Sequence, residues 1–145
     1  MFYARPSRAT QVMNSFFGWL ASVGLTPKDT VRLEVRGRRS GEMRSVAVTS
    51  VEHEGQRYLV SPRGESEWVR NVRAAGGEAV LRHGKAEAVR LEELPAGERA
   101  AIIQAYLKKT QRATGQHFGV KAEAGIEEFE GIASRHPVFR VVGSG

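Results

Sequence analysis

Hydrophobic and polar residues alternate along the middle of the chain with the two-residue period of β-strands. Val31, Leu33 and Val35 alternate with charged residues, which predicts a strand buried on one face. A β-branched run at Ser45–His53 and a shorter run at Arg57–Ser61 predict two further strands, separated by glycine-containing turns. Strands joined by such short turns pair antiparallel, because a parallel crossover needs a dozen or more residues.

Helical spacing replaces this alternation in four places. Apolar residues recur three and four positions apart at residues 7–23, 66–75 and 95–110, and more weakly around 126–132. Ser66 is a candidate N-cap of the second helix, and Gly76 and Gly77 are typical of a helix end.

The remaining segments complete an antiparallel sheet. Residues 78–82 and 86–94 predict a hairpin, and residues 137–142 predict a sixth strand. We therefore expect an α+β fold with peripheral helices, in which six mostly antiparallel strands form a small closed or split barrel. At 145 residues the chain is expected to form a single domain. It would consist of an N-terminal helical arm at residues 1–27 and a barrel with inserted helices at residues 28–142.

Composition excludes several classes of site. The chain has no cysteine, which excludes disulfides, thiolate zinc sites and a cysteine nucleophile. Its four histidines show no zinc-ligand spacing, so no metal is expected. No apolar run is long enough to span a membrane, and the first ten residues lack the apolar core of a secretory signal. The sequence therefore predicts a cytoplasmic protein.

The positive charge is concentrated in one segment. The formal net charge is +6, and five arginines lie within Arg32–Arg44. The sequence Gly37-Arg38-Arg39-Ser40-Gly41 predicts a tight turn, with Arg44 following it. Backbone N–H groups in such a turn can bind an anion, and guanidinium groups add bidentate contacts to phosphate. The alternative is a solvated basic hairpin.

A second candidate segment follows the third strand. Ser61-Pro62-Arg63-Gly64 predicts a rigid loop against which a planar ring could lie. Trp68 and Asn71 are three residues apart and therefore share a face of the next helix. The alternative is that Trp68 only anchors this helix on the barrel.

Together these segments resemble the deazaflavin-dependent nitroreductase family. The resemblance rests on GRRSGEMRSVAV, on YLVSPRG and on EWVRNVRAAGG, and it covers Thr30–Leu94 well and residues 137–142 more loosely. It implies a split β-barrel and the reduced deazaflavin coenzyme F420.

The resemblance also implies which residues bind the cofactor. Three arginines would contact its phosphate and acidic tail, three residues of the second strand would lie beside its ring, four loop residues would cradle the ring and ribityl chain, and two helix residues would close over it. In that order they are Arg38, Arg39, Arg44, Val46, Ala47, Val48, Ser61, Pro62, Arg63, Gly64, Trp68 and Asn71. On the substrate side this chain has His117, Phe118 and Phe129 where well-studied members have tyrosines, so reduction of nitro drugs is not implied.

These observations predict an oxidoreductase that transfers a hydride from reduced coenzyme F420 to a small electron-poor acceptor, such as a quinone or an enone. The cofactor carries the hydride, so no catalytic side chain is expected. Two alternatives remain open: FMN as the cofactor, and a non-catalytic carrier of a cofactor or a lipid-like anionic ligand.

Several partners are also considered. Nucleic acid is not expected, because Arg32–Arg44 contains no aromatic residue. A homodimer is expected, since so small a barrel leaves an apolar sheet face to cover. The N-terminal helix, with Phe16, Phe17, Trp19 and Leu20, could associate weakly with a membrane, although packing on the barrel or on a second subunit is the simpler interpretation.

Overall fold

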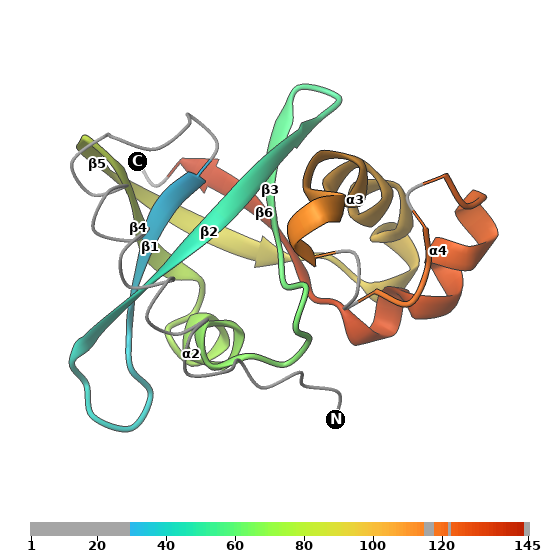
Figure 1. Ribbon diagram of the computed structural model, residues 1–145. Helices are drawn as coiled ribbons and strands as arrows, with labels where there is room; N and C mark the ends of the chain where they lie inside the picture. Colours follow the sequence, from blue (N-terminus) through green and yellow to red (C-terminus); the bar gives the residue numbers. More distant parts are fainter. Residues whose placement is uncertain (1–29, 115–117, 122, 144–145) are drawn as a thin grey trace.

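Six strands close an antiparallel barrel in a computed structural model that describes residues 30–114, 118–121 and 123–143 (Figure 1). Their order around the barrel is β1-β2-β3-β6-β5-β4, and each neighbouring pair is antiparallel. The strands are β1 (Thr30–Arg36), β2 (Met43–His53), β3 (Gln56–Val60), β4 (Glu78–His83), β5 (Lys85–Glu93) and β6 (Val138–Gly143). The α+β split-barrel prediction is confirmed.

The interior of the barrel follows from the alternation along β1. Val31, Leu33 and Val35 point inward and are at most 6% exposed, while the residues between them are half-buried. They pack with residues from the other strands, including Leu59 of β3 and Phe139 of β6. One face of each strand therefore supplies the core of the barrel.

Two strands are buried on both faces. In β3, Leu59 belongs to the barrel core, whereas the adjacent Val60 belongs to a second core outside the barrel. In β6, Phe139 and Val138 divide in the same way. Because consecutive side chains of a strand point to opposite faces, each apolar pair joins the two cores.

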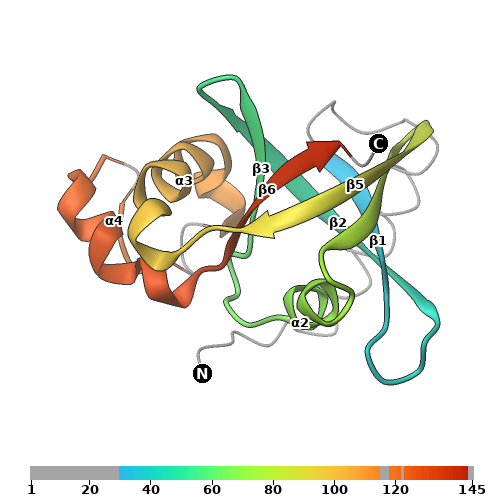
Figure 2. The same ribbon diagram turned by 180° about the vertical axis from the view of Figure 1, so that it is seen from behind.

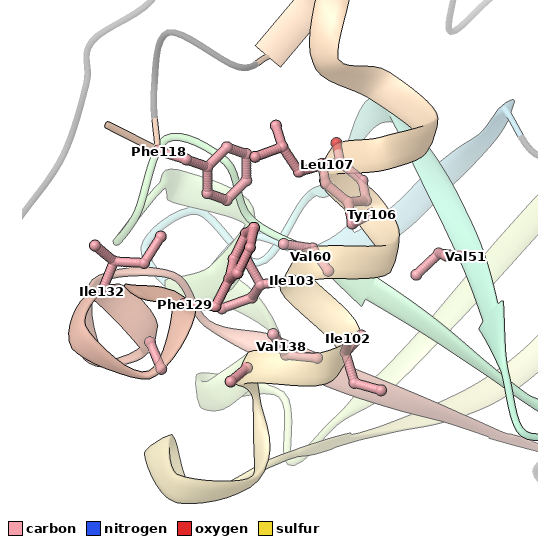
Figure 3. Packing of buried hydrophobic residues seen from close by; sticks show 12 residues of the cluster. Val51, Val60, Ile102, Ile103, Tyr106, Leu107, Phe118, Phe129, Ile132 and Val138 are labelled. Carbon is pink, nitrogen blue, oxygen red and sulfur yellow. The ribbon is translucent and has the colours of Figure 1, made fainter. Parts of the chain in front are cut away.

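The helices form two groups (Figures 1 and 2). Helix α2 (Glu67–Ala74) lies at one end of the barrel, where Val69 and Val72 enter the barrel core. Helices α3 (Ala100–Thr114) and α4 (Ile126–Ile132), with the short helix η3 (Ala133–Arg135), pack around the second core. Figure 3 shows Ile103 and Tyr106 of α3 in this core beside Val60.

One helix boundary differs from the prediction. The helix expected over residues 95–110 begins at Ala100 and is preceded by a 3₁₀ turn, η1 (Ala96–Glu98). Gly97 has low helix propensity. Arg99, only 8% exposed, donates from Nε to the Leu94 carbonyl and from Nη1 to the Ala133 carbonyl. These bonds fix the chain at the point where the helix begins.

The predicted N-terminal arm at residues 1–27 lies outside the described residues, and so does the membrane association proposed for its helix. Within the described part of the chain, no helix is both long and apolar enough to cross a membrane.

The two glycines after α2 provide a test of the packing between α2 and β5. Both have positive φ, but a Cβ on Gly77 would lie 2.5 Å from the Leu91 carbonyl oxygen, whereas a Cβ on Gly76 would meet nothing within 4 Å. We expect Gly76→Ala to lower the free energy of unfolding by about 1–2 kcal/mol, the cost of left-handed backbone for a residue with a side chain. Gly77→Ala should cost at least about 1 kcal/mol more because backbone must move.

Urea unfolding of the two variants measures this difference. Equal losses would show that the close approach of Gly77 to β5 is not needed for stability.

Candidate functional site

The arginine turn is attached to helix α2 through Arg38. The backbone N–H of Arg38 donates to the Asn71 Oδ1 at 3.1 Å, and its Nη1 donates to the same oxygen at 2.8 Å. Asn71 is 5% exposed, so its amide oxygen depends on these bonds for its partners. The sequence motif therefore brings Arg38 and Asn71, 33 residues apart, into direct contact.

The same guanidinium also binds a carboxylate of α2. Arg38 Nη1 lies 2.8 Å from Glu67 Oε2, and Glu67 is one helical turn before Asn71. Hydrogen bonding by Arg38 holds the pKa of Glu67 below its usual value, and the charges of Arg38, Arg39 and Arg70 act in the same direction. Neither Glu67 nor Arg70 is predicted as a site residue from the sequence. The only local signal is their spacing, since Glu67 lies four residues and Arg70 one residue before Asn71.

The register of β2 places the expected ring-contacting residues on two faces. Arg44, Val46 and Val48 pair with the inward-facing residues of β1, whereas Ala47 pairs with Arg32 on the outer face. Cross-strand partners lie on the same side of a sheet. Val46 and Val48 are only half-buried, and Arg44 at the end of this row is exposed. One side of β2 therefore carries a charged residue near its start, followed by two partly accessible apolar residues.

The loop after β3 is held by its own side chains. Ser61 is 0% exposed. Its hydroxyl donates to the Gly64 carbonyl at 2.6 Å and lies 3.2 Å from the Ser66 hydroxyl. Ser66 occupies the N-cap position of α2 but makes no side-chain capping bond. The hydroxyl of Ser61 therefore shapes the loop, and the half-buried Pro62 and Arg63 form its outer part.

Trp68 anchors α2 on the barrel. Its ring lies 5.6 Å from that of Phe139, at an interplanar angle of 52°, and packs against the barrel core. It nevertheless stays half-buried, like Val46 and Val48 in the same cluster.

A chain of ion pairs fixes the loop and α2 to the rest of the molecule. Arg73 of α2 binds Glu65 of the loop and, at 2.7 Å, Glu93 at the end of β5. Glu93 also lies 3.2 Å from the Arg99 Nη2. Arg73, and to a smaller extent Arg99, keep the pKa of Glu93 below its usual value.

Two of the three residues expected on the substrate side are buried in the second core. Phe118 and Phe129 are 2% and 0% exposed and belong to the core around α3 and α4 (Figure 3). The centroid of the Phe118 ring lies 4.4 Å from that of the His136 ring, with the two rings tilted by 39°, and the His136 Nδ1 lies 3.2 Å from the Ser61 carbonyl oxygen. The rings of Phe118 and His136 therefore support the loop from the side of the helical core. The third expected residue, His117, lies outside the described residues.

The arrangement suits a ligand with an anionic end and a planar apolar end. Guanidinium groups at the turn offer charge-assisted hydrogen bonds, and the half-buried Val46, Val48 and Trp68 offer apolar contact. Across the described ranges there is no group of three or more His, Cys, Asp or Glu residues placed to hold a metal ion.

Comparison with known proteins identifies relatives. The family model for F420H(2)-dependent quinone reductase matches residues 9–122. No curated protein matches the chain. A solved F420-H2 dependent reductase superposes with a TM-score of 0.50 at 22% identity, over 79% of this chain and 94% of its own.

Two further solved structures share the fold. A protein described as a domain-swapped dimer has a TM-score of 0.57 at 18% identity, covering 92% of this chain and 93% of its own. An FAD-binding protein of Mesorhizobium loti has a TM-score of 0.53 at 18% identity, covering 88% and 89%. At these identities the similarity shows the fold alone.

The contact between Arg38 and Asn71 predicts different effects for adjacent arginines. Arg38→Ala removes a bond from a buried amide oxygen and should lower the free energy of unfolding by about 1 kcal/mol. Arg39→Ala should change it by less than about 0.5 kcal/mol, because Arg39 is exposed. Thermal unfolding of the ligand-free variants measures both, and equal stabilities would mean that Arg38 does not attach the turn to α2.

Proposed function

The chain belongs to the F420H(2)-dependent quinone reductase family and is a reductase that uses coenzyme F420, and we propose that its acceptor is a quinone or a similar small electron-poor compound. The family supports this acceptor, and the observation that supports the binding of the cofactor is the row along β2. In this row Arg44 is followed on the same face by the half-buried Val46 and Val48, which pack in the same cluster as Trp68 of α2.

We assign the anionic end of the cofactor to the arginine turn. Coenzyme F420 carries a phosphodiester and glutamate carboxylates, and Arg38, Arg39 and Arg44 can donate charge-assisted hydrogen bonds to them. Arg38 is already oriented by Asn71, so less side-chain entropy is lost when a ligand binds it.

The remaining assigned residues would hold the ring. Val46, Val48 and Trp68 would contact its apolar surface, with Ala47 contributing backbone. The loop Ser61–Gly64 would border it, with Pro62 and Arg63 outermost. When bound, the cofactor supplies the hydride. The protein's part is to hold ring and acceptor in contact and to exclude water.

FMN is retained as the second candidate cofactor, because an FAD-binding protein has the same fold. We also propose a homodimer, supported by the similarity to a protein described as a domain-swapped dimer. A monomeric mass in light scattering would exclude it.

The two cofactors differ in charge, which predicts their relative affinities. We expect F420 to bind more tightly than FMN, because its tail offers more anionic groups to the turn. The affinity should fall as salt rises, since much of the attraction is electrostatic. Arg44→Ala should weaken F420 binding by about 1.5–3 kcal/mol, the range for hydrogen bonds to charged groups.

Fluorescence titration of both cofactors at several salt concentrations measures these affinities. FMN binding as tight as that of F420 would contradict the cofactor assignment, and normal binding by Arg44→Ala would contradict the placement of the tail.

Turnover distinguishes an enzyme from a carrier. We expect the protein to oxidise reduced F420 in the presence of quinones or enones, which is measured as the return of the absorbance and fluorescence of the oxidised cofactor. Phe118→Ala is a poor probe of acceptor preference. It would open a cavity in the helical core and cost about 3–5 kcal/mol. No protein-dependent oxidation with any acceptor, despite firm F420 binding, would favour the carrier.

A further inference from the structure

A carboxylate lies among the guanidinium groups of the candidate site. Glu67 Oε2 is 2.8 Å from Arg38 Nη1, and the charges of Arg39 and Arg70 also act on Glu67. The Glu67 side chain is 66% exposed, whereas that of Arg38 is 18% exposed. The acid therefore contacts this cluster of positive charge from its solvent side.

Arg38 has two partners on α2 with different properties. Asn71 is neutral and buried, and it accepts from both the backbone and the side chain of Arg38. Glu67 is charged and exposed, and it accepts only from the side chain. Asn71 can thus keep the turn attached to α2 when Glu67 moves away.

We propose that Glu67 is an internal counter-ion that an anionic group of the ligand replaces on Arg38. The proposal rests on the proposed function, in which the tail of F420 binds at this turn. Binding is then an exchange, in which one carboxylate leaves the guanidinium and a phosphate or carboxylate oxygen of the ligand takes its place.

This exchange makes Glu67 a specificity-determining residue. A carboxylate tethered one helical turn from Asn71 is present at high effective concentration. A ligand displaces it efficiently only if it offers bidentate phosphate or several anionic groups at once. Ligands with a weak or single negative charge are disfavoured. Because Arg38 is partly neutralised in the free protein, the affinity should also depend less on salt than the number of arginines suggests.

The test uses Glu67→Gln, which keeps an oxygen able to accept from Arg38 and removes only the negative charge. Its matched control is Glu42→Gln, which removes the same charge from the exposed turn without touching the Arg38 pair. The ligands are coenzyme F420 and the deazaflavin nucleoside that lacks the phosphodiester and glutamates, each titrated by fluorescence at low and high salt.

We expect Glu67→Gln to bind F420 about twofold to fivefold more tightly at low salt, the equivalent of one exposed ion pair. The gain should fade at high salt, so that the variant shows the steeper salt dependence. Binding of the tail-less nucleoside should not change, and Glu42→Gln should gain less than Glu67→Gln.

Unchanged or weaker F420 binding by Glu67→Gln would overturn the proposal, and so would an equal gain in Glu42→Gln or an equal gain for the nucleoside. If the proposed function itself is wrong, the same titrations give a different result. The wild-type protein would then bind F420 no better than the nucleoside, and neither affinity would depend on salt.

Discussion

The architecture depends on the pairing of the last strand, β6, with both β3 and β5. Without these two ladders the other five strands would form an open sheet. The same strand also positions the candidate site. The Pro137 carbonyl just before it accepts from the Ser61 N–H, and His136 contacts the Ser61 carbonyl. Barrel closure and the position of the loop therefore come from one short segment near the end of the chain.

Helix α2 makes the remaining contacts that hold the parts of the site together. Asn71 receives the arginine turn, Trp68 packs on Phe139, and Arg73 joins the loop to the end of β5. Trp68 and Asn71 lie on one face of this eight-residue helix, and Arg73 lies on another. Such a helix has little stability alone, so its fixed position comes from these partners. The site is therefore assembled from segments that α2 joins through these contacts.

The sequence predicts the elements better than their contacts. Period-two alternation identifies β1 because its inner face is uniformly apolar, and the arginine turn and the W-x-x-N helix are visible as motifs. The order of the strands cannot be predicted in this way, because nothing local in Val138 or Phe139 reveals that β6 lies between β3 and β5. The anchoring of Arg38 by Asn71 is hidden for the same reason. The packing of Phe118 is hidden in the same way, since nothing local in the sequence reveals that this aromatic ring lies in the core around α3 and α4.

The pairing of Arg44 with Val35 limits how the turn between β1 and β2 can vary among related proteins. Side chains alternate along a strand, so a shift of one residue in the hairpin would move Arg44, Val46 and Val48 to the outer face and bring Ala47 inward. Length changes that alter the register by two residues would preserve the face. Homologous chains that keep this site should therefore differ in the turn by even numbers of residues, or compensate an odd one with a bulge.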